Sequence, residues 1–425
     1  MRRILWIAGY VLWELIRPVP ATAEPSASPP LTLEWAIEQA LIHNPQIAAA
    51  RARWQASTEE APQRRALDAP SIYTMFWAVP HDTPNPFSAR EVWLGIKQRL
   101  PYPGKLDLKG RIADASAEMA RQRYLSVEEE VTHQVRKAYF DLYIIYKEVE
   151  INDRHLDLAR EFAQIAESKY ATGTGSQGNV LKALVEVAYL ANQIEVLNRR
   201  RQTGEVRLNI LMDREPRTPP GRPAEFALVP LVQTLDELQQ IALTNRSERR
   251  TVELAIVRSE VVGDLARRDY YPDFMTDFSY WNVRDQQNRW MLMLEANIPI
   301  AFWSRGKHDA RVLQAEAEKK AWEASLKELD NQILYAVEHA FADLEIATAH
   351  IRLYQKTILL QAEQAVEALR IAYQTDQESL LNLVDSERRL HQFELDYHRA
   401  RIDYEKSLAD LERAVGIPLR SQEKK

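Results

Sequence analysis

The sequence is organised around ADASAEMARQRYLSVEEEVTHQVRKAYFDLYIIYKEVEINDRHLDLAREFAQIAESKY, which spans residues 113–170. Apolar or small side chains recur in it every three or four residues, the spacing of a helix that supercoils against its neighbours. They are Val135, Ala138, Leu142, Ile145, Val149, Leu156, Ala159, Ala163, Ala166 and Tyr170, with the polar Asn152 in one slot of the seam. No proline lies between Lys105 and Tyr170. We therefore expect one helix on the order of 100 Å long, at about 1.5 Å per residue.

The composition fits a folded chain and excludes several kinds of chemistry. The 425 residues are 46% hydrophobic and 27% charged, which is enough apolar content to bury a core. The net charge of −6 comes from interleaved acidic and basic residues, which argues against nucleic acid as a partner. The absence of cysteine excludes disulfides, thiolate metal sites, cysteine nucleophiles and the acylated cysteine of a bacterial lipoprotein.

The first 23 residues have the pattern of an export signal. Two arginines precede an apolar run from Ile4 to Trp13, and small residues at 21–23 offer a cleavage site. Glu14 and Arg17 lie between the run and this site, so the alternative is an amphipathic N-terminus that is not cleaved. No other stretch approaches the roughly 20 apolar residues of a spanning helix. A mature chain that crosses a membrane would therefore have to do so with strands.

The same order of predicted elements occurs twice in the sequence. The matching positions are Thr32 with Thr234, Gly104-Lys105 with Gly306-Lys307, Tyr170 with Tyr373, and Asn179 with Asn382. The offset between the copies drifts by a single residue, which two unrelated coiled coils would not reproduce. We therefore predict a signal peptide at 1–23, a first repeat at 24–213, a Pro-rich linker at 214–233, a second repeat at 234–416 and a tail at 417–425.

Each repeat contains a strand pair, at 72–100 and 273–300, where the helical period disappears. In the first repeat we expect Pro62 and Pro70 to break the helical pattern before the strands. The second pair has one apolar and aromatic face, formed by Phe274, Thr276, Phe278, Tyr280, Trp290, Leu292, Leu294, Ala296 and Ile298. The alternating positions are Asp273, Met275, Asp277, Ser279, Met291, Met293, Glu295 and Asn297.

Two environments fit this alternation, a soluble sandwich and a membrane barrel with a wet lumen. At about ten residues, each strand is long enough to cross a bilayer. Four strands cannot close a barrel, since the smallest have about eight, so closure would require an oligomer.

At this point the chain resembles the TolC-type outer-membrane efflux proteins, over roughly residues 31–418. The segments that carry the resemblance are ALIHNPQI at 40–47, LPYPGK at 100–105, YATGTGSQGNVL at 170–181, LNILMDREP at 208–216 and LERAVGIPL at 411–419. Their order and their duplication make the resemblance specific, whereas any single motif would be weak.

The resemblance implies a mostly α fold with a small β part, assembled as a homotrimer. Four strands from each protomer would form a twelve-stranded barrel in outer-membrane lipid, and the long helices would continue it as a coiled-coil tunnel in the periplasm of a Gram-negative bacterium. The implied function is the exit channel of a tripartite efflux pump, with a periplasmic adaptor and an inner-membrane transporter of the RND type as partners. Such a duct is not an enzyme and needs no cofactor.

The cargo is less constrained by the resemblance. The LPYPGK-type strand exit and the missing lipid anchor are similar to the heavy-metal branch, so we favour metal cations. Drug efflux and a type I secretion duct stay open. Two other classes compete: a periplasmic adaptor, which would need one hairpin flanked by β-domains, and a structural coiled-coil spacer, which would lack amphipathic strands and an export signal.

In the family the two hairpin tips form the periplasmic gate, so the resemblance marks Tyr170, Asn179, Tyr373, Asp376, Glu378 and Asn382 as gate candidates. The usual acid–base pair is replaced here by Asn179 and Glu378, and Asp376 stands in place of a glycine. We expect either a hydrogen bond between Asn179 and Glu378 or a ring of acidic residues that favours cations. The alternative is that the tip charges only stabilise the start of the following helix.

The sequence offers few other candidates for catalysis or metal binding. The sequence has no phosphate-binding, dinucleotide-binding, zinc-protease or serine-elbow motif. His391, Glu394 and His398 lie at spacings of three and four and could ligate a metal, but such a trio is more often an ordinary surface. Met291 and Met293 could bind a copper-group ion, although packing or barrel lining is the simpler interpretation. We therefore assign no metal site.

Overall fold

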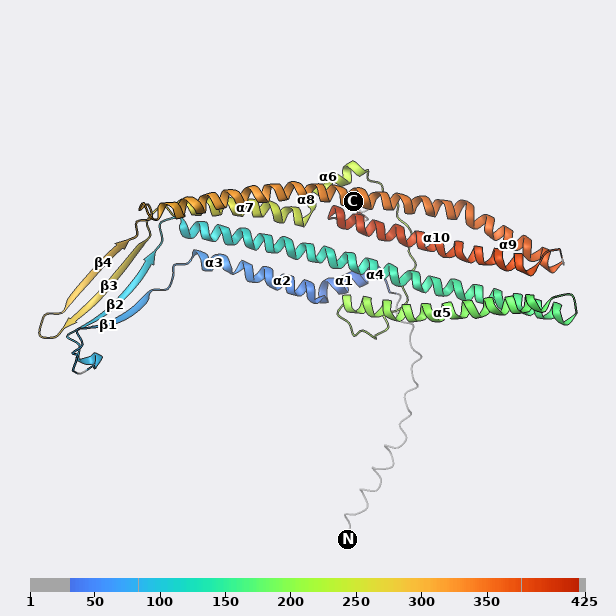
Figure 1. The fold of residues 1–425 in the computed structure, drawn as a ribbon, viewed down its shortest axis with the longest axis horizontal. Helices are drawn as coiled ribbons and strands as arrows, with labels where there is room; N and C mark the ends of the chain where they lie inside the picture. Colours follow the sequence, from blue (N-terminus) through green and yellow to red (C-terminus); the bar gives the residue numbers. More distant parts are fainter. Residues whose placement is uncertain (1–30, 83, 376, 420–425) are drawn as a thin grey trace, which may run out of the picture.

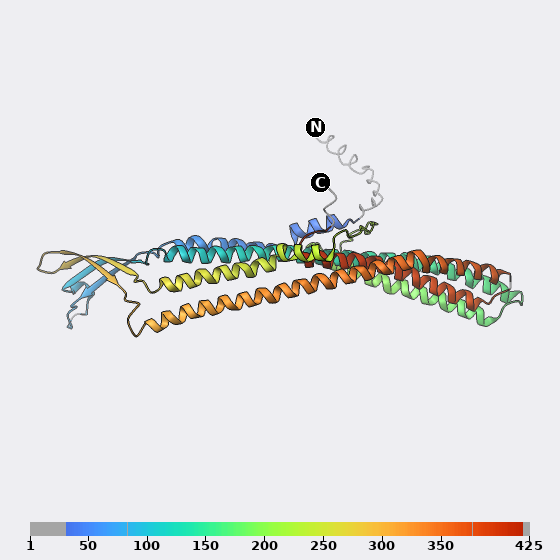
Figure 2. The ribbon, with the colours of Figure 1, turned by 90° about the horizontal axis from the view of Figure 1, so that it is seen from above.

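The computed structural model describes residues 31–82, 84–375 and 377–419. They form an elongated molecule with a small sheet at one end and two helical hairpin tips at the other (Figures 1 and 2). The predicted signal at 1–23 and the gate candidate Asp376 lie outside the described residues.

The first half contains five helices and two strands. They are α1 (Leu33–His43), α2 (Pro45–Thr58), α3 (Glu60–Arg65), β1 (Ser71–Trp77), β2 (Glu91–Leu100), α4 (Lys105–Ala171) and α5 (Gln177–Leu211), with a 3-10 turn, η1, at Pro86–Ser88. The sequence predicted that Pro62 breaks the helical pattern, and this is wrong. The helix instead breaks at Glu59 and restarts, so Pro62 falls in the first turn of α3, where its missing N–H costs nothing.

The second half repeats the order of helices, strand pair and long hairpin. It consists of α6 (Leu235–Asn245), α7 (Ser247–Arg268), β3 (Phe274–Val283), β4 (Arg289–Ala296), α8 (Arg305–Leu353), a π-helical turn η2 (Tyr354–Ile358), α9 (Leu359–Gln374) and α10 (Leu380–Val415). The helices α1 and α6 begin at corresponding threonines: Thr32 Oγ1 accepts from Trp35 N at 3.3 Å, and Thr234 Oγ1 accepts from Glu237 N at 3.4 Å.

The long helix predicted from the heptad-like seam is confirmed, since α4 runs unbroken for 67 residues. Its counterpart in the second half is interrupted at η2. A π turn holds one residue more than an α-helical turn. The extra residue of the second repeat therefore lies here, because the offset between the halves is 202 at Gly104 and Gly306 but 203 at Tyr170 and Tyr373.

The four strands form one antiparallel sheet in the order β1-β2-β3-β4, so both predicted strand pairs belong to the same sheet. The central pair, β2 with β3, joins the two halves through contacts such as Leu94 opposite Tyr280. Near the helices, Gly104 adopts a left-handed φ of 88° at the start of α4. The next residue, Lys105, is buried and its Nζ lies 2.9 Å from Asp273 Oδ1, just before β3.

The apolar core is divided between the two halves, one cluster around Phe140, Leu142 and Leu208 and another around Val337 and Leu411. A third cluster lies near the hairpin tips, where residues of both hairpins pack together: Phe162, Ala163, Ala166, Ala183, Tyr373, Leu380, Leu383 and Val384. Over the part of the chain that the structure describes, no helix is both long and apolar enough to cross a membrane.

Candidate functional site

Three regions of the molecule carry functional features: the sheet, the hairpin tips and a buried charged cluster between the hairpins. The register of the sheet places the predicted aromatic and aliphatic positions of β3 and β4 on one face, because Phe278 is opposite Leu292 and Tyr280 is opposite Trp290. We call this the apolar face. Most of its side chains are exposed; Leu294, for example, is 72% exposed. A protein in water does not normally leave so continuous an apolar surface uncovered.

The opposite face of the sheet, which we call the polar face, carries charges and hydrogen bonds. Tyr73 donates its hydroxyl to Asp277 at 2.9 Å, and Lys97 Nζ lies 3.6 Å from the same carboxylate. The Tyr73 ring covers Gly95, where a Cβ atom would come within 2.4 Å of the ring. Met293, predicted as packing or lining, lies on this face because it is opposite Asp277. A sheet with these two faces suits a wall between lipid and water.

At the first hairpin tip, Tyr170 lies near the end of α4 and is 50% exposed. Asn179 lies in the first turn of α5, and its backbone N–H donates to the Ser176 hydroxyl at 3.3 Å. At the second tip, Tyr373 lies near the end of α9 and is buried. The two predicted aromatic tip residues therefore differ, since one faces solvent and the other is part of the core.

The remaining candidates, Glu378 and Asn382, contact each other. Asn382 Nδ2 donates to Glu378 Oε2 at 2.8 Å, and the backbone N–H of Ser379 donates to the same oxygen at 3.2 Å. Within the described chain Glu378 therefore bonds to its own hairpin, and the hydrogen bond expected with Asn179 is not formed. Glu378 directly precedes the N-cap residue Ser379, a position at which a carboxylate also stabilises the start of α10.

Lys169 is a tip residue that sequence reasoning missed. Its Nζ donates to the carbonyl oxygen of Tyr373 at 2.8 Å and lies 4.4 Å from the centroid of the Tyr373 ring. It thus joins the first tip to the second by a hydrogen bond and a cation–π contact. The signal was present but weak: a lone lysine directly before the aromatic residue of the first tip.

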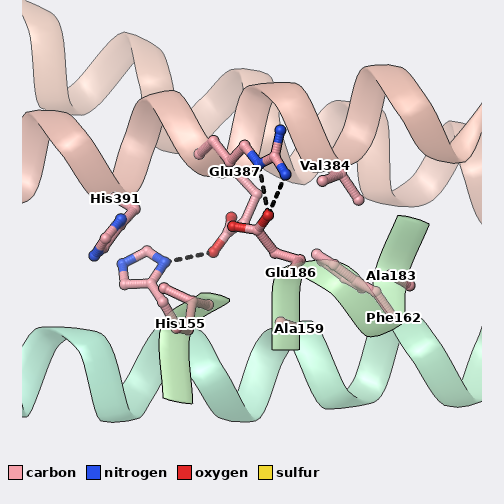
Figure 3. A pocket seen from close by; sticks show the side chains of 10 residues that line it. His155, Ala159, Phe162, Ala183, Glu186, Val384, Glu387 and His391 are labelled. Atoms are coloured by element: carbon pink, nitrogen blue, oxygen red, sulfur yellow. Dashed lines mark hydrogen bonds and ion pairs between the residues drawn. The ribbon is translucent and has the colours of Figure 1, made fainter. Parts of the chain in front are cut away.

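Further from the tips, a buried charged cluster joins α4 and α5 to α10 (Figure 3). His155 on α4 is 2% exposed; its Nδ1 lies 2.7 Å from Glu387 Oε1, and its Nε2 lies 3.1 Å from Glu394 Oε2. His391 packs against it with ring centroids 4.7 Å apart. Beside them, Arg388 donates to Glu186 on α5. The cavity that these side chains line has a volume of about 20 Å³, room for one water molecule.

The two histidines of the cluster differ in protonation at neutral pH. Burial alone would lower the pKa of His155, but the hydrogen bonds to Glu387 and Glu394 outweigh it and raise this pKa to about 9. Burial, reinforced by the positive charge of His155, lowers the pKa of His391 to about 4. A cationic His155 therefore bridges two carboxylates, beside a neutral His391.

The sequence trio of His391, Glu394 and His398 does not form a metal site. Glu394 is bonded to His155 and, at 3.1 Å, to Arg154 Nη2. Nowhere in residues 31–82, 84–375 and 377–419 do three or more histidine, aspartate or glutamate side chains converge as metal ligands. His155 was missed because a lone histidine beside the seam gives no sign of its partners on another helix.

The sheet has one face that suits lipid, and long paired helices continue from it. These two features define a channel-type membrane protein. Residues 36–212 and 238–417 match the model of the "Outer membrane efflux protein" family, so the chain belongs to that family. It is an outer-membrane efflux channel that extends into the periplasm. The predicted mostly α fold with a small β part, the function as an outer-membrane efflux channel and the location are confirmed.

Known proteins agree with this assignment. The chain is 24% identical over 375 residues to the cobalt-zinc-cadmium resistance protein CzcC of Cupriavidus metallidurans, covering 87% of this chain and 86% of the relative. Among solved structures it is similar to the channel CusC, with a TM-score of 0.78, 16% identity and coverage of 95% and 97%. It is also similar to the outer-membrane channel MtrE of Neisseria gonorrhoeae, with a TM-score of 0.76, 18% identity and coverage of 91% and 89%.

Proposed function

We propose that three copies of the chain close a twelve-stranded β-barrel, and that this trimer is the exit duct of a tripartite pump for metal cations. The observation that carries the proposal is the sheet itself, which has two open edges, β1 and β4, and an exposed apolar face. Open edges recruit further strands. Because β1 and β4 run in opposite directions, β4 of one copy can pair antiparallel with β1 of the next, and the ring then has no edge.

The helical part supports the same assembly. The outer sides of both hairpins carry exposed apolar side chains: Leu181, Leu184, Val185 and Tyr189 on α5, Leu353 at the end of α8, and Leu360 and Ile371 on α9. Contacts between neighbouring protomers would bury these residues and close the helices into a tunnel. The partners of this trimer are a periplasmic adaptor and an inner-membrane transporter of the RND type, which supplies the energy; the duct performs no chemistry.

The metal cargo rests on two independent indications. The relative CzcC is named for resistance to cobalt, zinc and cadmium. In addition, each protomer brings Glu378, an exposed carboxylate, to the tip region, together with Asp376 in the sequence. Acidic rings favour cations by their field.

Planar-bilayer recording of the detergent-purified mature protein, with its mass measured in parallel, tests the proposal. A trimer that gives discrete cation-selective steps is the expected result. A water-soluble monomer that never inserts would contradict it. For the cargo, a host that lacks its own metal-efflux duct should regain resistance to zinc or cadmium when this chain is supplied with a cognate pump and adaptor. Restored resistance to organic drugs alone would refute the metal assignment.

A further inference from the structure

Three tryptophans cross the polar face of the sheet at the end farthest from the helices. Trp77 ends β1, Trp93 lies near the start of β2, and Trp281 lies near the end of β3. The ring centroids of Trp93 and Trp281 are 3.9 Å apart, with an interplanar angle of 6°. Those of Trp77 and Trp93 are 6.2 Å apart, with an angle of 12°.

The register fixes the face on which these rings lie. Trp93 is opposite Trp281, and each is two residues from a polar-face position, Gly95 and Ser279 respectively. Trp77 is two residues from the position opposite Trp93. Side chains two residues apart in a strand share a face. The three indoles are therefore on the same side as Asp277, away from the apolar face.

The stacking shows how the rings stand. Neighbouring strands are about 4.8 Å apart. Indoles that lay flat on the sheet would meet edge to edge, whereas two parallel rings 3.9 Å apart on neighbouring strands must stand upright. Each ring is also held by its own strand, since Trp93 Nε1 donates to Glu91 Oε2 at 3.1 Å and Trp281 Nε1 donates to Ser279 Oγ at 3.0 Å. The planes of the two indoles therefore stand across the sheet surface rather than lying flat on it.

We propose that Trp77, Trp93 and Trp281 form an aromatic constriction that narrows the extracellular mouth of the channel and limits the size of the solutes that pass it. The inference rests on the proposed function, because the polar face becomes a lumen only when three sheets close a barrel. Arg289 on β4 is opposite Trp281, so each protomer contributes three indoles and one guanidinium to the ring. Hydrophobic constrictions in water-filled pores restrict passage by dewetting as well as by size.

Size exclusion from one side of a bilayer tests this constriction separately from the distant helical tips. Neutral polyethylene glycols of graded size are added only to the compartment that faces the extracellular mouth, and the largest polymer that changes the conductance is recorded. In Trp93→Ala and Trp281→Ala this cutoff should shift to larger polymers. The cutoff measured from the periplasmic side should not move. Trp290→Ala, on the apolar face, is the matched control and should leave both cutoffs unchanged.

Circular dichroism provides a second measurement that does not need channel activity. Two stacked indoles give an exciton couplet, which Trp93→Phe should abolish and Trp290→Ala should retain. A couplet that survives Trp93→Phe, or an unchanged mouth-side cutoff in channels of both alanine variants, would overturn the constriction alone. If the native chain forms no channel at all, the proposed function fails, and the constriction fails with it.

Discussion

His155 Nδ1 on α4 lies 2.7 Å from Glu387 Oε1 on α10, and this contact joins residues 232 positions apart in the sequence. It ties the hairpin of the first half to that of the second, at a depth where solvent is excluded. Arg399 and Glu148 form a parallel connection nearby, with Nη2 and Oε1 at 2.7 Å. The relative position of the two hairpins is therefore set by buried and partly buried charges as well as by apolar packing.

Removing the imidazole should destabilise the protein strongly. His155→Ala leaves Glu387 and Glu394 without their shared cation, and loss of one partner from a buried ionic cluster costs roughly 3–5 kcal/mol. Thermal unfolding of the detergent-purified protein measures the loss. Arg160→Ala is the control: it breaks the exposed pair with Asp157 and should cost less than about 1 kcal/mol. Equal decreases in melting temperature for the two variants would show that the His155 bridge stabilises the protein no more than an exposed ion pair does.

The stability of the hairpin pair should peak near pH 6.5, the ordinary pKa of histidine. The pKa of His155 is raised to about 9, so its contribution is complete below pH 6.5 and is lost as the pH rises through 9. The pKa of His391 is lowered to about 4, so stability also falls as the pH drops from 6.5 towards 4. Melting temperatures across pH 4–9 test this. In His391→Leu the melting temperature should fall less steeply between pH 6.5 and pH 4, because the titration of that ring is removed. In His155→Gln it should fall less steeply towards pH 9. Unchanged slopes in these variants would contradict the assignment.

Lys169→Met should loosen the tips while leaving the rest of the molecule folded. It removes the hydrogen bond to the Tyr373 carbonyl and the cation–π contact, worth roughly 0.5–2 kcal/mol for the latter, but keeps the aliphatic stem. We expect a higher single-channel conductance and an unchanged melting temperature of the barrel. Lys182→Met, on an exposed site of α5, is the matched control. A native conductance in Lys169→Met would exclude this residue from the gate.

Charge reversal at the second tip tests the acidic ring. The double variant Asp376→Lys and Glu378→Lys replaces both carboxylates of this tip by ammonium groups. The reversal potential in a salt gradient should shift towards anions, because the sign of the local field changes. Asp385→Lys, on an exposed part of α10 beyond the first turn, should have a smaller effect. If the reversal potentials stay native, these acids serve only the helix start.

A charge on the apolar face of the sheet should block membrane assembly. Leu292→Arg places a guanidinium where the proposed barrel meets lipid, at a cost of about 2–4 kcal/mol per copy near the bilayer midplane. Met293→Arg, one residue along β4 on the polar face, should be tolerated. The fraction of trimer recovered from outer membranes measures the difference. Equal recovery of both variants would contradict the assignment of the two faces.

Sequence reasoning reached the fold because its main signals are periodic. The seam from Val135 to Tyr170 predicted α4, and the alternation around Trp290 predicted both the strand and its two faces. The restart of the helix before Pro62 was missed, because a proline inside a helical pattern usually ends it and nothing local marks a break at Glu59.

The buried cluster could not be predicted, because its geometry is tertiary. His155 is separated from Glu387 and Glu394 by more than two hundred residues, and only the packing of α4 on α10 brings them together. Along α10 alone, Glu394 belonged to a histidine trio on one helix face. The aromatic constriction could not be predicted for the same reason, because Trp93 and Trp281 become neighbours only through the pairing of β2 with β3.

The π turn η2 makes the two hairpins mechanically different. An ancestral duplication would have given two equal helices, and a later single-residue insertion would have rotated everything beyond it by about 100° had the backbone stayed α-helical. The π turn absorbs the insertion, so α9 still presents its apolar side to α10. Wider turns are common points of bending in long helices, and the ribbon changes direction between α8 and α9 (Figure 1). The continuous helix α4 of the first half thus has an interrupted counterpart in the second half, and any widening of the periplasmic end should start from the interrupted helix.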